Sequence, residues 1–204
     1  EKGAGGDYNV VGVRLDPAVF KTLMAASKTD TSFNIIAKSI LIKESARAEG
    51  VTAADTAILL ADAKAARIAR RHPEATIIGA DQLLVCEGEW FDKPEDMAAA
   101  RSHLHKLRNR AHELVTAVVV WRNGQRAWHH LATPRLAMRD FSEAFLDEYL
   151  AREGGFVTQS VGAYRLEGMG IQLMRDIRGE HTAILGLPLL PLLGYLRDAG
   201  LVKT

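Results

Sequence analysis

The feature that most constrains the fold is the Asn123-Gly124 dipeptide, which lies between two segments rich in strand-forming residues. Asn-Gly is the strongest short signal for a two-residue turn between antiparallel strands. We therefore expect a long hairpin, with residues 114–121 in one strand and residues 126–138 in the returning strand. Such a hairpin excludes a fold built only from parallel strands and crossover helices.

Two shorter apolar segments, residues 75–80 and 83–86, predict two further strands. A turn at Glu87-Gly88 would connect the second of them to Trp90-Phe91.

Helical signals alternate with these strands. Thr52 and Asp55 resemble a capping box, and the helical spacing behind them continues until Pro73. We expect further helices with Pro94 in the first turn, after Ser142 as N-cap, and over residues 188–196. Together these elements predict an α/β fold with one mixed, curved β-sheet flanked by helices around a central cleft. The expected organisation is a single domain over residues 1–204, with room for two lobes.

Composition narrows the functional class. Lys and Arg number 26 against 25 Asp and Glu, so the basic excess that is typical of nucleic-acid binding is absent from the totals. No apolar run in the sequence is long enough to span a bilayer, and Cys86, the only cysteine, cannot form an intrachain disulfide. The first residues, Glu1 to Gly6, do not have the apolar core expected of a signal peptide. We therefore expect a cytoplasmic protein that binds neither nucleic acid nor membrane.

The sharpest chemical cluster is Gly79-Ala80-Asp81-Gln82, followed by Lys93 before a proline. An acidic residue at the end of a buried strand lies where α/β folds commonly bind ligands. A carboxylate can bind a divalent cation or activate water, and a lysine can neutralise phosphate. The alternative is a strand-terminal Asp and a solvated Lys without a chemical role, and spacing alone leaves both interpretations open.

Two other regions carry weaker signals. Lys64 lies mid-helix among small residues that would let another element approach closely, although a lone helical lysine is usually solvated. Residues 162–170 are rich in glycine without matching a phosphate loop, and Glu167 among them can accept hydrogen bonds from a ligand. The seven histidines show no metal-binding spacing, so we interpret them as structural.

Taken in order, the motifs between Lys43 and Leu201 resemble the Maf family of nucleoside triphosphate pyrophosphatases. The matching residues are Leu60-Ala61, Lys64-Ala65, Gly79-Ala80-Asp81-Gln82, Lys93-Pro94, Leu104, Leu107, Arg110-Ala111-His112, Thr116, Gly162-Ala163-Tyr164, Glu167-Gly168, Gly170, Gly179 and Gly186-Leu187-Pro188. Each is weak alone, but their order and spacing are specific.

The resemblance implies a homodimeric α/β hydrolase that uses a divalent cation, Mg²⁺ or Mn²⁺, to convert a nucleoside triphosphate to the monophosphate and pyrophosphate. Asp81 would be the proton acceptor or the metal ligand. Lys64 and Lys93 would hold the triphosphate and stabilise charge on the leaving pyrophosphate.

The family also divides by substrate. Members that act on dTTP and UTP tend to have Asp-Thr after the strand and a Gln before the later glycine. Here Asp81-Gln82 and Glu167 resemble the group that prefers 7-methyl-GTP, and Gln82 and Glu167 join the expected substrate-binding set. A carboxylate can accept both N–H groups on the pairing edge of guanine, and it favours the positive charge of an N7-methylated base.

Residues 1–43 are atypical for the family, which normally has a Ser-x-Ser-x-x-Arg phosphate loop followed by Val-Asp-Glu. Ser27 is the nearest match to the loop, without a following arginine, and residues 37–39 are Ala-Lys-Ser where Val-Asp-Glu is expected. The departure fits a divergent segment, an imperfect sequence over this stretch, or a protein that has lost catalysis. A second hypothesis is therefore a non-catalytic nucleotide- or protein-binding regulator of cell division. A house-cleaning enzyme of the inosine triphosphate type is a third.

Overall fold

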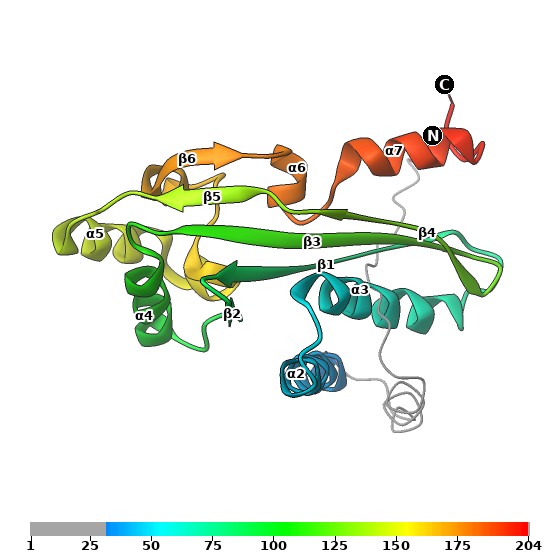
Figure 1. Ribbon diagram of the computed structural model, residues 1–204, viewed down its shortest axis with the longest axis horizontal. Helices are drawn as coiled ribbons and strands as arrows, with labels where there is room; N and C mark the ends of the chain where they lie inside the picture. The colour runs from blue at the N-terminus through cyan, green and yellow to red at the C-terminus, as the bar shows by residue number, and fades with distance from the viewer. Residues whose placement is uncertain (1–31, 204) are drawn as a thin grey trace, which may run out of the picture. The chain divides into compact units, whose positions relative to one another are not determined.

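The computed structural model describes residues 32–203, with the side chains of residues 39–203 (Figure 1). The helices are α2 (Ser32–Ala48), α3 (Ala53–Ala69), α4 (Met97–Leu107), α5 (Glu143–Glu153), α6 (His181–Ile184) and α7 (Leu189–Asp198). The strands are β1 (Ile77–Cys86), β2 (Glu89–Phe91), β3 (Ala111–Arg122), β4 (Gln125–Ala132), β5 (Arg135–Met138) and β6 (Met174–Arg178). Three short 3-10 helices, Gly154–Thr158, Val161–Ala163 and Met169–Leu173, precede β6. The mixed α/β class expected from the sequence is confirmed.

The strands form one sheet in the order β2-β1-β3-β5-β6, and β4 also pairs with β3. The hairpin between β3 and β4 turns at Asn123 and Gly124, which have φ angles of 51° and 74°. This confirms the Asn-Gly prediction. The returning strand was expected to be continuous, but it is divided into β4 and β5 at Thr133-Pro134. Proline has no N–H to donate to the ladder, although its carbonyl still accepts a hydrogen bond from Leu114 N–H at 3.0 Å.

The prediction of two strands at residues 75–80 and 83–86 is wrong, because β1 is a single strand of 10 residues. Asp81 and Gln82 lie inside it rather than in a loop. Polar side chains are tolerated at these central positions because each one has a partner from outside the strand. The β1–β2 hairpin at Glu87-Gly88 is confirmed.

The helix boundaries follow mainly from capping. Thr52 accepts the backbone N–H of Asp55 at 3.1 Å and caps α3, and Ser142 caps α5 by accepting from Phe145 at 3.2 Å. Both caps were predicted. Pro94 was expected in the first turn of α4, but it lies before the helix. Asp96 caps α4 instead and accepts from Ala99 N–H at 2.7 Å. None of the described helices is long and apolar enough to cross a membrane.

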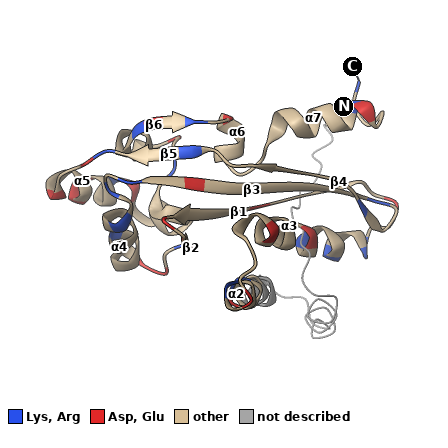
Figure 2. Ribbon diagram, viewed as in Figure 1, with Lys and Arg blue, Asp and Glu red and all other residues tan. Residues whose placement is uncertain are grey.

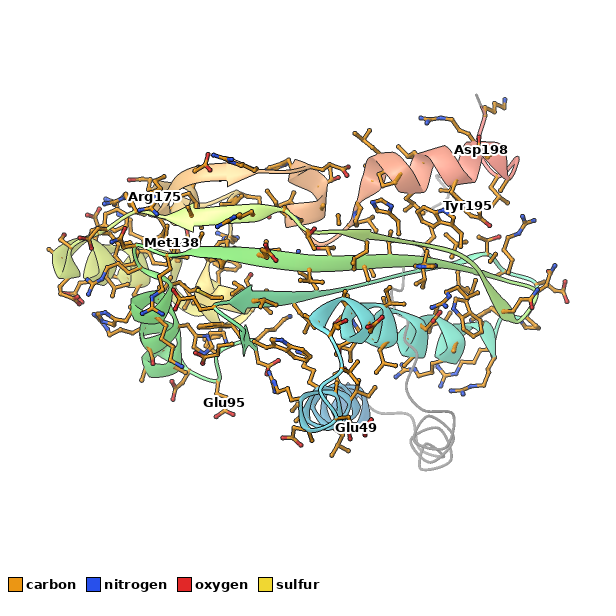
Figure 3. The ribbon with its side chains drawn as sticks, in the orientation of Figure 1. Glu49, Glu95, Met138, Arg175, Tyr195 and Asp198 are labelled. Carbon is orange, nitrogen blue, oxygen red and sulfur yellow. The ribbon has the colours of Figure 1, made fainter. Side chains whose placement is uncertain are left out.

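The described chain divides into two compact units. The first unit contains residues 32–81, Ala117–Leu131 and residues 188–203, and the second contains Gln82–Thr116 and Ala132–Leu187. In the first unit, Tyr195 of α7 points toward β4 (Figure 3), where its ring stacks on Trp128 with centroids 5.0 Å apart. In the second unit, a buried cluster gathers around Leu84, Leu104 and Tyr149.

Candidate active site

An ion pair between Lys64 and Asp81 is the central feature of the first unit. Lys64 projects from α3 and its ammonium nitrogen Nζ donates to Asp81 Oδ1 on β1. The side chains are 36% and 17% exposed, so the pair is shielded from water without being sealed from it. Two residues that were selected separately from the sequence are therefore brought together in the structure.

The composition of α3 explains how Lys64 reaches the strand. Ala57, Ala61 and Ala65 are each 0% exposed and share one face of the helix at spacings of four residues. Small side chains on the buried face let the helix axis approach its neighbour closely. The helix also carries other acidic and basic residues (Figure 2). Lys64 is the one whose position on the helix brings its side chain to Asp81.

A second carboxylate on α3, Asp62, has a different environment. Its side chain is 8% exposed and pairs with Arg126, while Trp121 Nε1 donates to its Oδ1 at 2.5 Å. Both partners belong to β3 and β4 of the same unit. Because its oxygens are occupied by these donors, Asp62 anchors α3 to the sheet.

Gln82, the next residue of β1, belongs to the second unit. Its amide nitrogen Nε2 donates to Thr116 Oγ1 at 2.7 Å and to the carbonyls of Ala183 and Ile184 at 3.0 and 3.1 Å. Thr116 Oγ1 in turn donates to the Ala183 carbonyl at 3.0 Å. The Ala183 carbonyl also accepts the backbone N–H of Gly186 at 3.1 Å, so the Gln82 amide adds side-chain hydrogen bonds at the end of α6 and fixes this helix to the sheet.

The glycine-rich segment 162–170 is held by buried aromatic residues of the second unit. Gly162 and Ala163 have left-handed φ angles of 77° and 61°, and a Cβ at Gly162 would lie 2.4 Å from Leu84. Tyr149 Oη donates to the Ala163 carbonyl at 3.0 Å, which holds the second of these residues in place. A side chain at Gly162 would therefore clash with Leu84 and would strain the left-handed backbone at this position.

His112 forms a buried pair with Tyr164, which lies within this segment. His112 Nε2 and Tyr164 Oη share a hydrogen bond of 2.7 Å, and the two side chains belong to residues 1% and 5% exposed. Burial lowers the pKa of His112 to about 4 and raises the pKa of Tyr164 well above its ordinary value. Both groups are therefore neutral at physiological pH. The structural interpretation of the histidines did not foresee this contact, which joins residues 52 positions apart.

Glu167 and Lys93 are both exposed and lie on separate segments of the second unit. Glu167 is in the turn before Gly168 and makes no hydrogen bond or ion pair with the described residues. Lys93 follows β2 and precedes Pro94. Ser27, the remaining predicted site residue, lies outside the described residues.

The comparisons with known proteins agree with this arrangement of motifs. A sequence model described as Maf-like protein matches residues 21–199. The chain is 59% identical over 158 residues to the nucleoside triphosphate pyrophosphatase of Granulibacter bethesdensis, covering 78% of this chain and 80% of that protein. It is 53% identical over 163 residues to the protein of the same name from Rhodospirillum rubrum, covering 80% and 81%. It is also 42% identical over 163 residues to the 7-methyl-GTP pyrophosphatase of Rhizobium meliloti, covering 80% and 82%.

The chain belongs to the Maf-like protein family. The resemblance drawn from the motifs is thereby confirmed. One residue that the motifs missed is Glu153, whose buried carboxylate binds Arg165 and Met169. A glutamate at the end of a helix, just before Gly154-Gly155, was the available signal, because a negative charge is unfavourable at a helix C-terminus.

The described residues do not contain three His, Cys, Asp or Glu side chains grouped to hold a metal ion. Asp81, which is partly exposed and pairs with Lys64, can contribute one carboxylate to such a site. Mg²⁺ is usually bound by one or two carboxylates together with substrate phosphates rather than by a cage of protein ligands. A single carboxylate therefore fits a divalent cation that arrives with a triphosphate.

Proposed function

We propose that this Maf-like protein hydrolyses a nucleoside triphosphate to the nucleoside monophosphate and pyrophosphate. The observation that carries the proposal is the partly buried Lys64–Asp81 pair. It joins an acidic and a basic group on rigid elements, which is what phosphoryl chemistry needs for positioning and charge stabilisation. The names of the relatives, two nucleoside triphosphate pyrophosphatases and a 7-methyl-GTP pyrophosphatase, support the same reaction class.

In this reaction a water molecule adds to phosphorus, and the anhydride bond between the α- and β-phosphates breaks. The Asp81 carboxylate either accepts the proton of the attacking water or binds the divalent cation, Mg²⁺ or Mn²⁺. When bound, the cation neutralises phosphate charge. Lys64 orients the Asp81 carboxylate and offers its remaining N–H groups to phosphate oxygens. Lys93 supplies a second ammonium group to the leaving pyrophosphate, and Ser27 supplies a hydroxyl.

We assign base recognition to Glu167 and a preference for 7-methyl-GTP to this site. A carboxylate without a partner among the described residues is available to accept the two N–H groups of a guanine edge. Its negative charge also favours the cationic base that N7 methylation produces. Gln82 has its amide nitrogen committed to three acceptors, so we assign it to shaping the substrate site through α6.

The test measures pyrophosphate release from 7-methyl-GTP, GTP, dTTP, UTP and ITP with Mg²⁺ or Mn²⁺. Asp81→Asn should lower kcat at least about a hundredfold, because it removes the charge of the group placed at the reaction centre. Asp198→Asn, at an exposed position on α7, is the matched control and should retain wild-type turnover. Equal rates for wild type and Asp81→Asn would refute the assignment, and turnover of dTTP or UTP that matches 7-methyl-GTP would refute the substrate preference.

A specific observation keeps a regulatory function as the second candidate. Helix α2 runs through residues 37–39, the place of the family's Val-Asp-Glu, and the sequence there is Ala-Lys-Ser. A folded protein that binds 7-methyl-GTP but releases no pyrophosphate would favour the regulator. We further propose a cytoplasmic homodimer, which cell fractionation and analytical ultracentrifugation test directly.

A further inference from the structure

A buried carboxylate binds both ends of the turn that carries Glu167. Glu153, the last residue of α5, has a side chain that is 6% exposed. Its Oε2 accepts Arg165 Nε at 2.9 Å, and its Oε1 accepts the backbone N–H of Met169 at 2.7 Å. Because the two donors flank Glu167 in the chain, one side chain ties both sides of the turn to α5.

The turn is also tightly packed at its base. The N–H of Gly168 donates to the Arg165 carbonyl at 3.4 Å. A Cβ at Gly170 would lie 2.2 Å from the same carbonyl oxygen, and a Cβ at Gly168 would lie 2.4 Å from Glu153 Oε1. The backbone of the turn therefore has little room to shift while Glu153 keeps both hydrogen bonds, and this holds the backbone of Glu167 in place.

Local stability does not explain a glutamate at this position. A negative charge is unfavourable at the C-terminal end of a helix, and burying a carboxylate carries a large desolvation cost. An apolar side chain could fill the same volume against the cluster of the second unit. What only the carboxylate provides is two acceptors for donors on either side of Glu167. Arg165 is held further by the Phe156 ring, 3.9 Å from its guanidinium carbon.

We propose that Glu153 is a positioning residue that sets base selectivity by fixing the turn of Glu167. The inference rests on the proposed function, in which Glu167 reads the base. Glutamine cannot replace Glu153, because one of its terminal groups is an NH₂ that would face either Arg165 Nε–H or Met169 N–H. Both of these are donors, so the variant keeps the size of the side chain but loses one anchor of the turn.

The kinetic experiment compares wild type, Glu153→Gln, Glu167→Gln and the double variant with 7-methyl-GTP and dTTP. Glu153→Gln should raise the KM for 7-methyl-GTP about tenfold, the usual scale for one lost hydrogen bond to a charged group, and leave kcat for dTTP within about twofold. The double variant should discriminate between 7-methyl-GTP and dTTP as well as Glu167→Gln alone does, because both changes act on one interaction. The matched control is Glu148→Gln, an exposed glutamate on the same helix that pairs with Arg152.

A merely structural role predicts a different pattern, in which Glu153→Gln lowers kcat/KM equally for both nucleotides. That result, or unchanged selectivity, would overturn the inference. Amide hydrogen exchange adds a readout that does not need turnover. Residues 165–170 should exchange about tenfold faster in Glu153→Gln and remain protected in Glu148→Gln. An inactive wild type would refute the proposed function without testing whether Glu153 holds the turn. Unchanged amide exchange of residues 165–170 in Glu153→Gln would show that Glu153 does not anchor this turn.

Discussion

The buried pair of His112 and Tyr164 makes the free energy of unfolding depend on pH. A substitution of His112 separates this dependence from that of the other titrating groups. The pKa of His112 is lowered by burial from 6.5 to about 4, so the folded protein keeps this ring neutral when the unfolded chain already binds a proton. A protonated ring has an N–H on both nitrogens, and Nδ1 is buried without a hydrogen-bond partner among the described residues, so one N–H of the imidazolium would stay unpaired. The stability that the neutral His112 ring contributes to the folded protein is therefore fully present above pH 6.5 and is lost as pH falls toward 4.

The two pKa values set the size of the effect. Between pH 8 and pH 5 the unfolded state gains nearly a full proton at this position and the folded state gains almost none. The free energy of unfolding should fall by about 2 kcal/mol over this range from His112 alone. His112→Gln removes the titrating group and keeps an amide within reach of Tyr164 Oη, so this variant should lose about 2 kcal/mol less than wild type over the same range.

Urea unfolding at pH 5, 6, 7 and 8 measures the difference, and His129→Gln on the exposed face of β4 is the control. His129→Gln should follow the wild-type slope. If His112→Gln loses stability as steeply as wild type between pH 8 and pH 5, the argument fails. An NMR titration of the His112 ring with a midpoint near 6.5 would refute it directly.

Two other substitutions and one labelling experiment test further details of the structure. Asp62→Asn should lower the free energy of unfolding by about 2 kcal/mol, because Arg126 loses its buried counter-charge, and chemical denaturation followed by tryptophan fluorescence measures it. Thr52→Ala should cost about 1 kcal/mol through the lost cap of α3, seen as a lower urea midpoint at unchanged slope. Burial, followed by the charge of Glu87, raises the pKa of the Cys86 thiol, so iodoacetamide should modify it only after unfolding, and fast labelling of the native protein would contradict this.

The features that the sequence predicted well are those whose partners lie nearby in the chain. Thr52 and Asp55 are three residues apart, and Asn123-Gly124 needs only its own dihedral angles to form a turn. The break at Pro134 was missed although its cause is local, because the residues on both sides favour strands and only the proline interrupts the ladder.

The candidate site residues were selected one by one from the sequence, which did not show the contacts between them. Lys64 and Asp81 lie 17 positions apart, and helix periodicity could not show that Lys64, the only lysine of α3, reaches a carboxylate on β1. The alanine face of α3 was noted as small, yet only the fold shows that it packs to bring Lys64 onto the strand. Glu153 was missed for the same reason, since its donors are 12 and 16 positions further along the chain.

The error over β1 shows how a strand interrupted by polar residues should be interpreted. Asp81 and Gln82 looked like the end of a strand because their partners are far away in the sequence, up to 102 positions in the case of Ile184. The boundary between the two compact units falls between these two residues, and Asp81 binds Lys64 of its own unit while Gln82 binds Thr116 and α6 of the other. In this chain, the two adjacent polar residues within an apolar strand each hold a contact distant in sequence, one in each unit. Breaking each anchor separately, with Lys64→Met and Gln82→Leu, should show whether turnover depends on both.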